Sequence, residues 1–123
     1  MDWEVCPEGL YDTLGRLHFD YGFPAIYITE NGAAYKDQVV DGQVDDPERI
    51  SYIQRHLQQE QRAIFSGIPV KGYFAWSMLD NFEWGYGYAK RFGLIYVDYQ
   101  TQQRILKSSA KWYGQVIHQN AVD

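Results

Sequence analysis

Apolar residues recur at three- and four-residue steps in two long stretches of the chain, and this spacing predicts two helices. The first begins near Pro7, because a proline followed by an acid suits a first helical turn, and it ends before Gly22. The second is capped by Asp46, carries Pro47 at its first position and ends at about Gly67. The apolar stripes comprise Leu10, Tyr11, Leu14, Leu17 and His18 in the first helix and Ile50, Ile53, Leu57, Ile64 and Phe65 in the second.

A third stretch with the same spacing closes the chain. Ser108 or Ser109 is expected to cap this helix, and His118 is expected to end it. Its inner side is predicted to consist of Trp112, Tyr113, Val116 and Ile117.

Continuous apolar runs lie between the helices and predict strands. Residues 25–29 form one run, and Glu30 directly follows it. Residues 68–78 form a second run, and residues 94–97 form a short third. Because a full helix separates the two longer runs, we expect parallel strands of an α/β fold. Two parallel strands leave sheet edges and faces uncovered, so the pattern indicates that part of a sheet is missing from this chain.

Composition narrows the class of protein. The 123 residues are 46% apolar, which is enough for one domain over residues 1–123. The net charge of −5 argues against nucleic acid and anionic membrane surfaces as partners. Cys6 is the single cysteine, and neither a signal segment nor an apolar run of membrane-spanning length occurs in the sequence, so the expected location is the cytoplasm.

Acids and indoles gather where the predicted strands end. Glu30 ends the first strand and is followed by a long loop, while Trp76 lies near the end of the second strand, ahead of Glu83 and Trp84. Each residue also has an ordinary interpretation, as a turn-capping acid, a solvated acid or a packed indole. Together they suit a sugar, because carboxylates accept hydrogen bonds from hydroxyls and indole rings cover the apolar face of a pyranose. The aromatic share of 17% agrees with either view.

Several motifs along nearly the whole chain resemble glycoside hydrolase family 1, the β-glucosidase and 6-phospho-β-glycosidase family. Residues 28–32, Ile-Thr-Glu-Asn-Gly, are similar to the nucleophile motif of that family, and residues 72–84, Gly-Tyr-Phe-Ala-Trp-Ser-Met-Leu-Asp-Asn-Phe-Glu-Trp, to its eighth strand and substrate loop. The match continues with Arg-Phe-Gly-Leu at residues 91–94. Residues 3–5 and 7–10 resemble the segment that this family places before its seventh barrel helix region, and residues 46–50 resemble the helix that follows the nucleophile loop.

The resemblance implies a role for five residues of this chain. Glu30 would be the nucleophile that forms a covalent glycosyl intermediate. Trp76 would lie under the glycone, Glu83 would accept hydrogen bonds from two sugar hydroxyls, Trp84 would donate its indole N–H to a third, and Phe92 would lie near the exocyclic carbon. An acid at Glu83 favours a β-glycoside that is not phosphorylated, although Lys90 and Arg91 are basic residues nearby.

The resemblance also implies that the chain is incomplete as a catalyst. The fold of the family is a TIM (β/α)8 barrel, of which this α/β chain would be the C-terminal part, about the last two βα units. A retaining glycosidase needs a second carboxyl group about 5 Å from the nucleophile, which this family places in an Asn-Glu-Pro motif that the sequence lacks. Asp80 is a weaker candidate for that role.

Two hypotheses for function follow. In the first, the chain is the nucleophile part of a retaining β-glycosidase and works together with the N-terminal remainder of the barrel. In the second, it is a truncated, non-catalytic family member that self-associates through open strand edges. No metal or cofactor is expected, because His18, His56 and His118 show no ligand spacing and no glycine-rich phosphate loop occurs.

Overall fold

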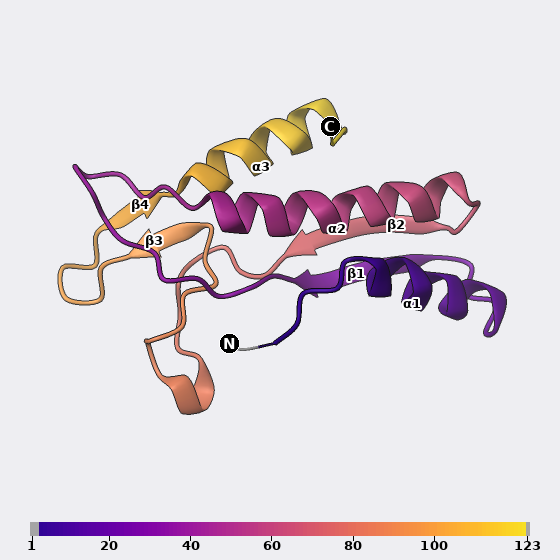
Figure 1. Ribbon diagram of the computed structural model, residues 1–123, viewed down its shortest axis with the longest axis horizontal. Coiled ribbons are helices and arrows are strands. Elements are labelled where there is room, and N and C mark those ends of the chain that lie inside the picture. Colours follow the sequence, from indigo (N-terminus) through magenta and orange to yellow (C-terminus); the bar gives the residue numbers. More distant parts are fainter. Residues whose placement is uncertain (1–2, 123) are drawn as a thin grey trace.

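The computed structural model describes residues 3–122, which form three α-helices, two short sheets and one 3-10 turn. The two longer strands run side by side with their arrowheads toward the end of the molecule that holds the loops and a small hairpin (Figure 1). In chain order the elements are α1 Glu8–Phe19, β1 Ile26–Asn31, α2 Pro47–Phe65, β2 Val70–Ala75, η1 Trp84–Tyr86, β3 Ile95–Val97, β4 Arg104–Leu106 and α3 Ser108–Gln119.

Strands β1 and β2 are parallel, as the helix between them predicts. The register pairs Ile26 with Val70, Ile28 with Tyr73 and Asn31 with Ala75, with shifts between these pairs. Both strands therefore end at the same edge, and the loops that follow them share that edge.

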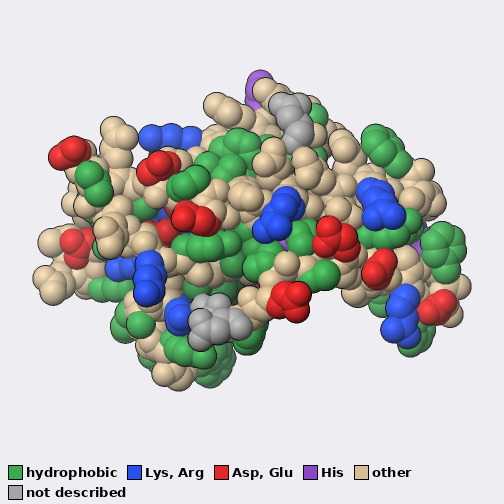
Figure 2. Space-filling model, viewed as in Figure 1, with side chains coloured by type: hydrophobic (Ala, Val, Ile, Leu, Met, Phe, Trp, Pro, Cys, Tyr) green, Lys and Arg blue, Asp and Glu red, His purple; other side chains and the backbone are tan. Residues whose placement is uncertain are grey.

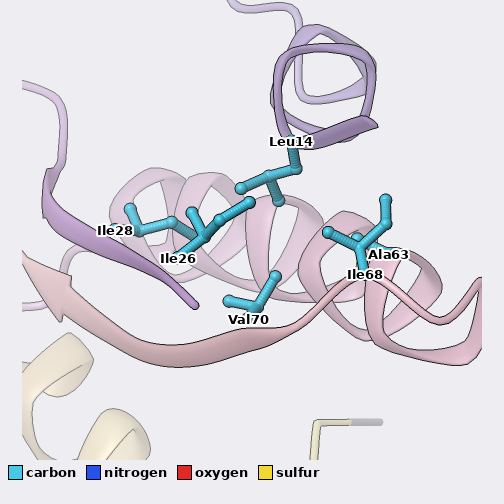
Figure 3. Close-up of a cluster of buried hydrophobic side chains, with 6 residues drawn as sticks. All are labelled: Leu14, Ile26, Ile28, Ala63, Ile68 and Val70. Carbon is cyan, nitrogen blue, oxygen red and sulfur yellow. The ribbon is translucent and has the colours of Figure 1, made fainter. Parts of the chain in front are cut away.

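The core lies between α1, α2 and one face of this sheet. Figure 3 shows Leu14 of α1 directed at Ile26, Ile28 and Val70 of the strands, with Ala63 of α2 beside them. These side chains are 8% exposed or less. The first predicted helix and its inward stripe are thus confirmed, and so is the start of the second helix at Pro47.

The opposite face of the sheet is open. Tyr27 of β1 and Phe74 of β2 are each 58% exposed, which agrees with the expectation that two parallel strands on their own leave part of the sheet uncovered. The second strand is shorter than predicted, because its pairing with β1 ends at Ala75. Apolar side chains on an uncovered sheet face indicate a surface that another layer is meant to cover.

Two helix faces differ from the predicted stripes. In the last turn of α2 the fully buried Ala63 takes the inward position, which turns Ile64 and Phe65 outward, so they are 47% and 81% exposed. In α3 the exposed fraction of Ile117 is 62%, so this residue does not belong to an inner side. Its predicted neighbours Trp112, Tyr113 and Val116 are half-buried.

The segment before α3 holds the remaining differences. Strand β4 pairs antiparallel with β3, and only β3 was predicted. The cap position of α3 is occupied by Lys107, so the prediction that Ser108 or Ser109 caps this helix is wrong. The backbone N–H of Ser109 donates instead to the buried carboxylate of Asp46 (2.8 Å), which holds the start of α3 beside the start of α2.

Candidate active site at the strand ends

Glu30 lies near the carboxyl end of β1, and Trp76 directly follows the carboxyl end of the adjacent strand β2. The backbone N–H of Trp76 donates to the carbonyl of Asn31 (2.8 Å), so the residues that follow Glu30 are fixed against the second strand end. The side chain of Glu30 is exposed, and Trp76 is 38% exposed. Gly32 permits this approach, because a Cβ atom there would lie 1.8 Å from the Trp76 carbonyl oxygen.

The amide of Asn31 is held from both sides by tyrosines. The hydroxyl of Tyr73 donates to Asn31 Oδ1 (2.7 Å), and Asn31 Nδ2 donates to the Tyr52 hydroxyl (3.4 Å). Burial raises the pKa of both tyrosines, so both phenols stay protonated at neutral pH. These contacts tie β2 and α2 to the residue next to Glu30. Sequence reasoning missed these hydrogen bonds, because Tyr52 and Tyr73 look like ordinary core residues in the sequence.

The loop between Asp80 and Arg91 carries Glu83 and Trp84, two further predicted sugar-binding residues. A tight turn holds its tip, where the Glu83 N–H donates to the Gly87 carbonyl (2.6 Å) and the Tyr86 N–H donates to the Glu83 carbonyl (2.8 Å). Glu83 is half-buried, whereas Trp84 is 83% exposed. The loop projects from the body of the molecule in Figure 1, and Figure 2 shows apolar side chains gathered at that lower end.

Phe92 differs from the other predicted site residues, because it is only 8% exposed. Its carbonyl accepts a hydrogen bond from the Ser77 N–H (3.2 Å), which joins the end of the loop to the residue after Trp76. Its side chain lines a cavity of about 130 Å³ together with Trp3, Tyr35 and Tyr52. The expected position of Phe92 near a sugar's exocyclic carbon stays a prediction.

A set of buried charged side chains lies behind these loops, and we call it the ion network. Its members are Asp37, Asp46, Arg49, Asp80, Arg91 and Lys107, and the side chain of each is at most 16% exposed. The set contains as many bases as acids, so each buried charge has a partner of opposite sign. Sequence reasoning treated Asp46 only as a helix cap and Asp80 only as a weaker candidate for the second carboxyl group, so it missed the network.

Arg49 shows how strongly these charges interact. Its guanidinium donates to both carboxylate oxygens of Asp37 (3.1 and 2.8 Å) and also pairs with Asp46. Burial alone would lower the pKa of Arg49, but the hydrogen bond and charge of Asp37 and the charge of Asp46 outweigh burial and raise it. Arg49 is therefore a permanent cation inside the structure.

The basic residues near the site are already engaged. Arg91 Nη1 donates to Asp80 (2.5 Å) and to the Val97 carbonyl (2.9 Å), and the guanidinium lies 3.9 Å from the ring centroid of Tyr96. The ammonium group of Lys90 lies 5.3 Å from the centroid of the Tyr86 ring. Arg91 thus acts as an internal partner of Asp80 in this structure.

Within residues 3–122, none of the helices combines the length and the apolar character that a membrane span requires. The same part of the chain holds no group of three or more His, Cys, Asp or Glu side chains arranged to hold a metal ion.

Comparison with known proteins places these features in a family. The model of glycosyl hydrolase family 1 matches residues 1–122. The chain is 52% identical over 124 aligned residues to beta-glucosidase A of Thermotoga maritima, covering 100% of this chain and 28% of that protein. It is 53% identical over 116 residues to a 6-phospho-beta-galactosidase of Streptococcus equi subsp. zooepidemicus, covering 94% of this chain and 25% of that protein.

Solved structures give the same result. The family 1 b-glucosidase from Thermotoga maritima in complex with isofagomine lactam superposes with a TM-score of 0.97 at 52% identity, over 98% of this chain and 28% of that one. The beta-glucosidase from the same organism in complex with deoxynojirimycin gives equal values. The chain thus spans little more than a quarter of the length of the proteins that it matches, and its fold is that of a fragment of a TIM-barrel glycosidase.

Proposed function

Because the chain belongs to glycosyl hydrolase family 1, we propose that it supplies the nucleophile and the glycone-binding residues of a retaining β-glycosidase of the β-glucosidase type. The observation that carries this proposal is the position of Glu30, whose exposed carboxylate lies at the end of β1 beside the end of β2. Reactive groups of barrel enzymes lie at this end of the strands.

In the proposed reaction the carboxylate of Glu30 attacks the anomeric carbon of a β-glycoside and forms a covalent glycosyl intermediate, which water then hydrolyses. A carboxylic acid outside this chain protonates the leaving oxygen in the first step and activates the water in the second. Asn31, held by Tyr52 and Tyr73, limits the movement of the strand end that carries the nucleophile.

Three further side chains would bind the glycone. Trp76 offers a partly exposed indole face next to Glu30, suited to the C–H face of a pyranose. Glu83 would accept hydrogen bonds from two hydroxyls, and the exposed indole of Trp84 would donate to a third. Phe92, whose side chain is buried, would line the region near the exocyclic carbon.

We propose a glycone without a phosphate group, although relatives of both kinds match the chain. A carboxylate at Glu83 would repel a phosphate brought to the same loop. Arg91 could not readily bind that phosphate, because its guanidinium already pairs with the buried Asp80.

The remainder of the barrel is the proposed partner of this chain. It would cover the exposed side chains of Tyr27 and Phe74 and bring in the acid. Self-association of the chain through its open strand edges is the second candidate, which the two-stranded β1–β2 sheet favours. The native mass of the purified particle separates the two: a heavier, different chain supports the first, and copies of the 123-residue chain alone support the second.

The test of the nucleophile uses a completed barrel, which is this chain joined to the part of Thermotoga maritima beta-glucosidase A that it does not match. Glu30→Gln is expected to lower kcat on an aryl β-glucoside by at least about a thousandfold, because the amide keeps the shape of the side chain and loses its nucleophilicity. Glu8→Gln, at an exposed position of α1, is the matched control and should leave kcat unchanged. Equal turnover by Glu30→Gln and the unmodified protein would rule out the proposed role.

A further inference from the structure

We infer that the buried ion network positions the sugar-binding loop relative to the nucleophile, with Asp80 as its central positioning residue. This inference rests on the proposed function, because it concerns the loop that carries Glu83 and Trp84. Asp80, Arg91 and Lys107 would act on the substrate only through that loop.

Asp80 joins the two ends of the loop. Its carboxylate accepts hydrogen bonds from Arg91 Nη1 (2.5 Å) and from the Gly93 N–H (2.9 Å), and it also accepts one from the Val97 N–H (3.4 Å). The side chain of Asp80 is fully buried. The residues between Asp80 and Arg91 therefore form a closed loop whose two ends are fixed to each other. The position of these ends determines where the tip of the loop with Glu83 can lie.

Lys107 links Asp80 to the segment that follows Glu30. Its fully buried ammonium group donates to Asp80 Oδ1 (2.9 Å) and to Asp37 Oδ2 (2.5 Å). Asp37 lies in the loop after β1, so the Lys107 side chain bridges the loops that follow the two strands. A shift of one loop would break a buried ion pair with the other.

Arg49 makes the second link between the same two loops. One of its terminal nitrogens, Nη2, donates to Asp37 (2.8 Å) and to the Arg91 carbonyl (2.9 Å). The Tyr35 N–H donates to the same carbonyl (3.2 Å). The Arg91 carbonyl oxygen, at the end of the sugar-binding loop, thus accepts hydrogen bonds both from helix α2 and from the loop after β1.

Energetics favour a positioning role over a stabilising one. The cost of removing charges from water largely cancels the attraction within a buried ion pair, and apolar side chains of equal volume often stabilise a protein as well or better. Breaking one partner leaves an uncompensated buried charge, so the network tolerates few geometries. Because Asp80 and Arg91 belong to this network and the other four members are linked to them, the network defines the position of the loop sharply.

The test compares two buried aspartates of the network in the completed barrel. Asp80→Asn removes the charge at the base of the loop, while Asp46→Asn removes a charge whose hydrogen bonds go to Arg49 and Ser109 and none to the loop. Both variants should lower Tm. Asp80→Asn should raise the Kd for deoxynojirimycin by about tenfold or more, whereas Asp46→Asn, which reaches the loop only through Arg49, should raise that Kd by less than about threefold.

Two outcomes would overturn the inference. One is an unchanged Kd in Asp80→Asn, and the other is an equal rise in both variants, since a purely structural role would affect both alike. If Asp80→Asn does not fold, Arg91→Lys is measured in its place, and a rise of about threefold or more is expected because lysine keeps the charge but loses the fork of donors.

The inference and the proposed function can fail separately. Absence of a catalytic effect in Glu30→Gln would remove the nucleophile proposal and would leave the Kd comparison intact, since binding does not require turnover. An unchanged Kd in Asp80→Asn, together with inactive Glu30→Gln, would remove only the positioning role.

Discussion

The two faces of the β1–β2 sheet differ in how far their apolar side chains are exposed. On one face Ile26, Ile28 and Val70 are 8% exposed and pack against α1 and α2. On the other, Tyr27 and Phe74 are each 58% exposed. The helices of the chain therefore cover one face of the sheet and leave the other face open.

Under the proposed function, this difference explains why the chain would contribute side chains to an active site without enclosing one. The side chains placed by its own helices and loops are held firmly, as the tyrosines around Asn31 show. The side chains on the open face, including Trp76, have nothing opposite them within the chain's described residues that would exclude water from a substrate. In our account, the remainder of the barrel supplies that opposite wall.

The largest effect on stability is expected on the covered face. Ile28→Ala should lower the free energy of unfolding by about 2–5 kcal/mol, because it leaves a cavity in the packed core. In the 123-residue chain, Tyr27→Ala should lower it by less than about 1 kcal/mol, because the ring is more than half exposed. Urea denaturation of both variants measures the comparison.

The same pair measured in the completed barrel sharpens the comparison. There the cost of Tyr27→Ala should rise, since the ring would be covered, and the cost of Ile28→Ala should stay nearly constant. An equal and small cost of Tyr27→Ala in both forms would show that the open face is not the surface that the remainder covers.

A smaller effect is expected from pH, again on the covered side. His56 of α2 is 5% exposed, and its Nδ1 lies 2.7 Å from the Tyr52 carbonyl oxygen. Burial lowers its pKa, so the unfolded chain takes up a proton near pH 6.5 before the folded chain does. Stability should therefore be complete above that pH and should fall by at most about 1 kcal/mol as the pH drops toward the lowered pKa.

His56→Asn keeps a donor near the Tyr52 carbonyl and removes the titrating ring, so it should flatten this dependence between pH 7.5 and about 6. His118→Asn, at an exposed position in α3, is the matched control and should keep the slope. Thermal melts across the same pH range provide the measurement. If the two variants show the same slope, His56 is not the group responsible.

The elements defined by local signals were predicted from sequence. A proline, an acid and an apolar stripe define the start of α2, and an apolar run that Asn31 and Gly32 interrupt defines the end of β1. Glu30 was singled out because such a strand end is recognisable from neighbouring residues alone. Strand β4 was missed, since its residues, which begin with Arg104 and end before Lys107, form no continuous apolar run like that of β3.

The ion network could not be predicted because its contacts are remote in sequence. Lys107 and Asp37 are 70 residues apart, and a charged residue in a loop ordinarily belongs to the surface. Asp46 illustrates the difficulty: its position before Pro47 correctly indicates a helix start, yet its carboxylate accepts hydrogen bonds from Ser109 of a different helix. Only the folded chain shows that this carboxylate binds the start of α3.

The most direct test of the central claim is to trap the proposed intermediate. The completed barrel is incubated with an activated 2-deoxy-2-fluoro-β-glucoside, whose fluorine slows hydrolysis of a covalent intermediate, and the labelled residue is located by mass spectrometry of peptides. The expected result is a single glucosyl label on Glu30 and none in Glu30→Gln. A label on a different residue, or equal labelling of the two proteins, would contradict it.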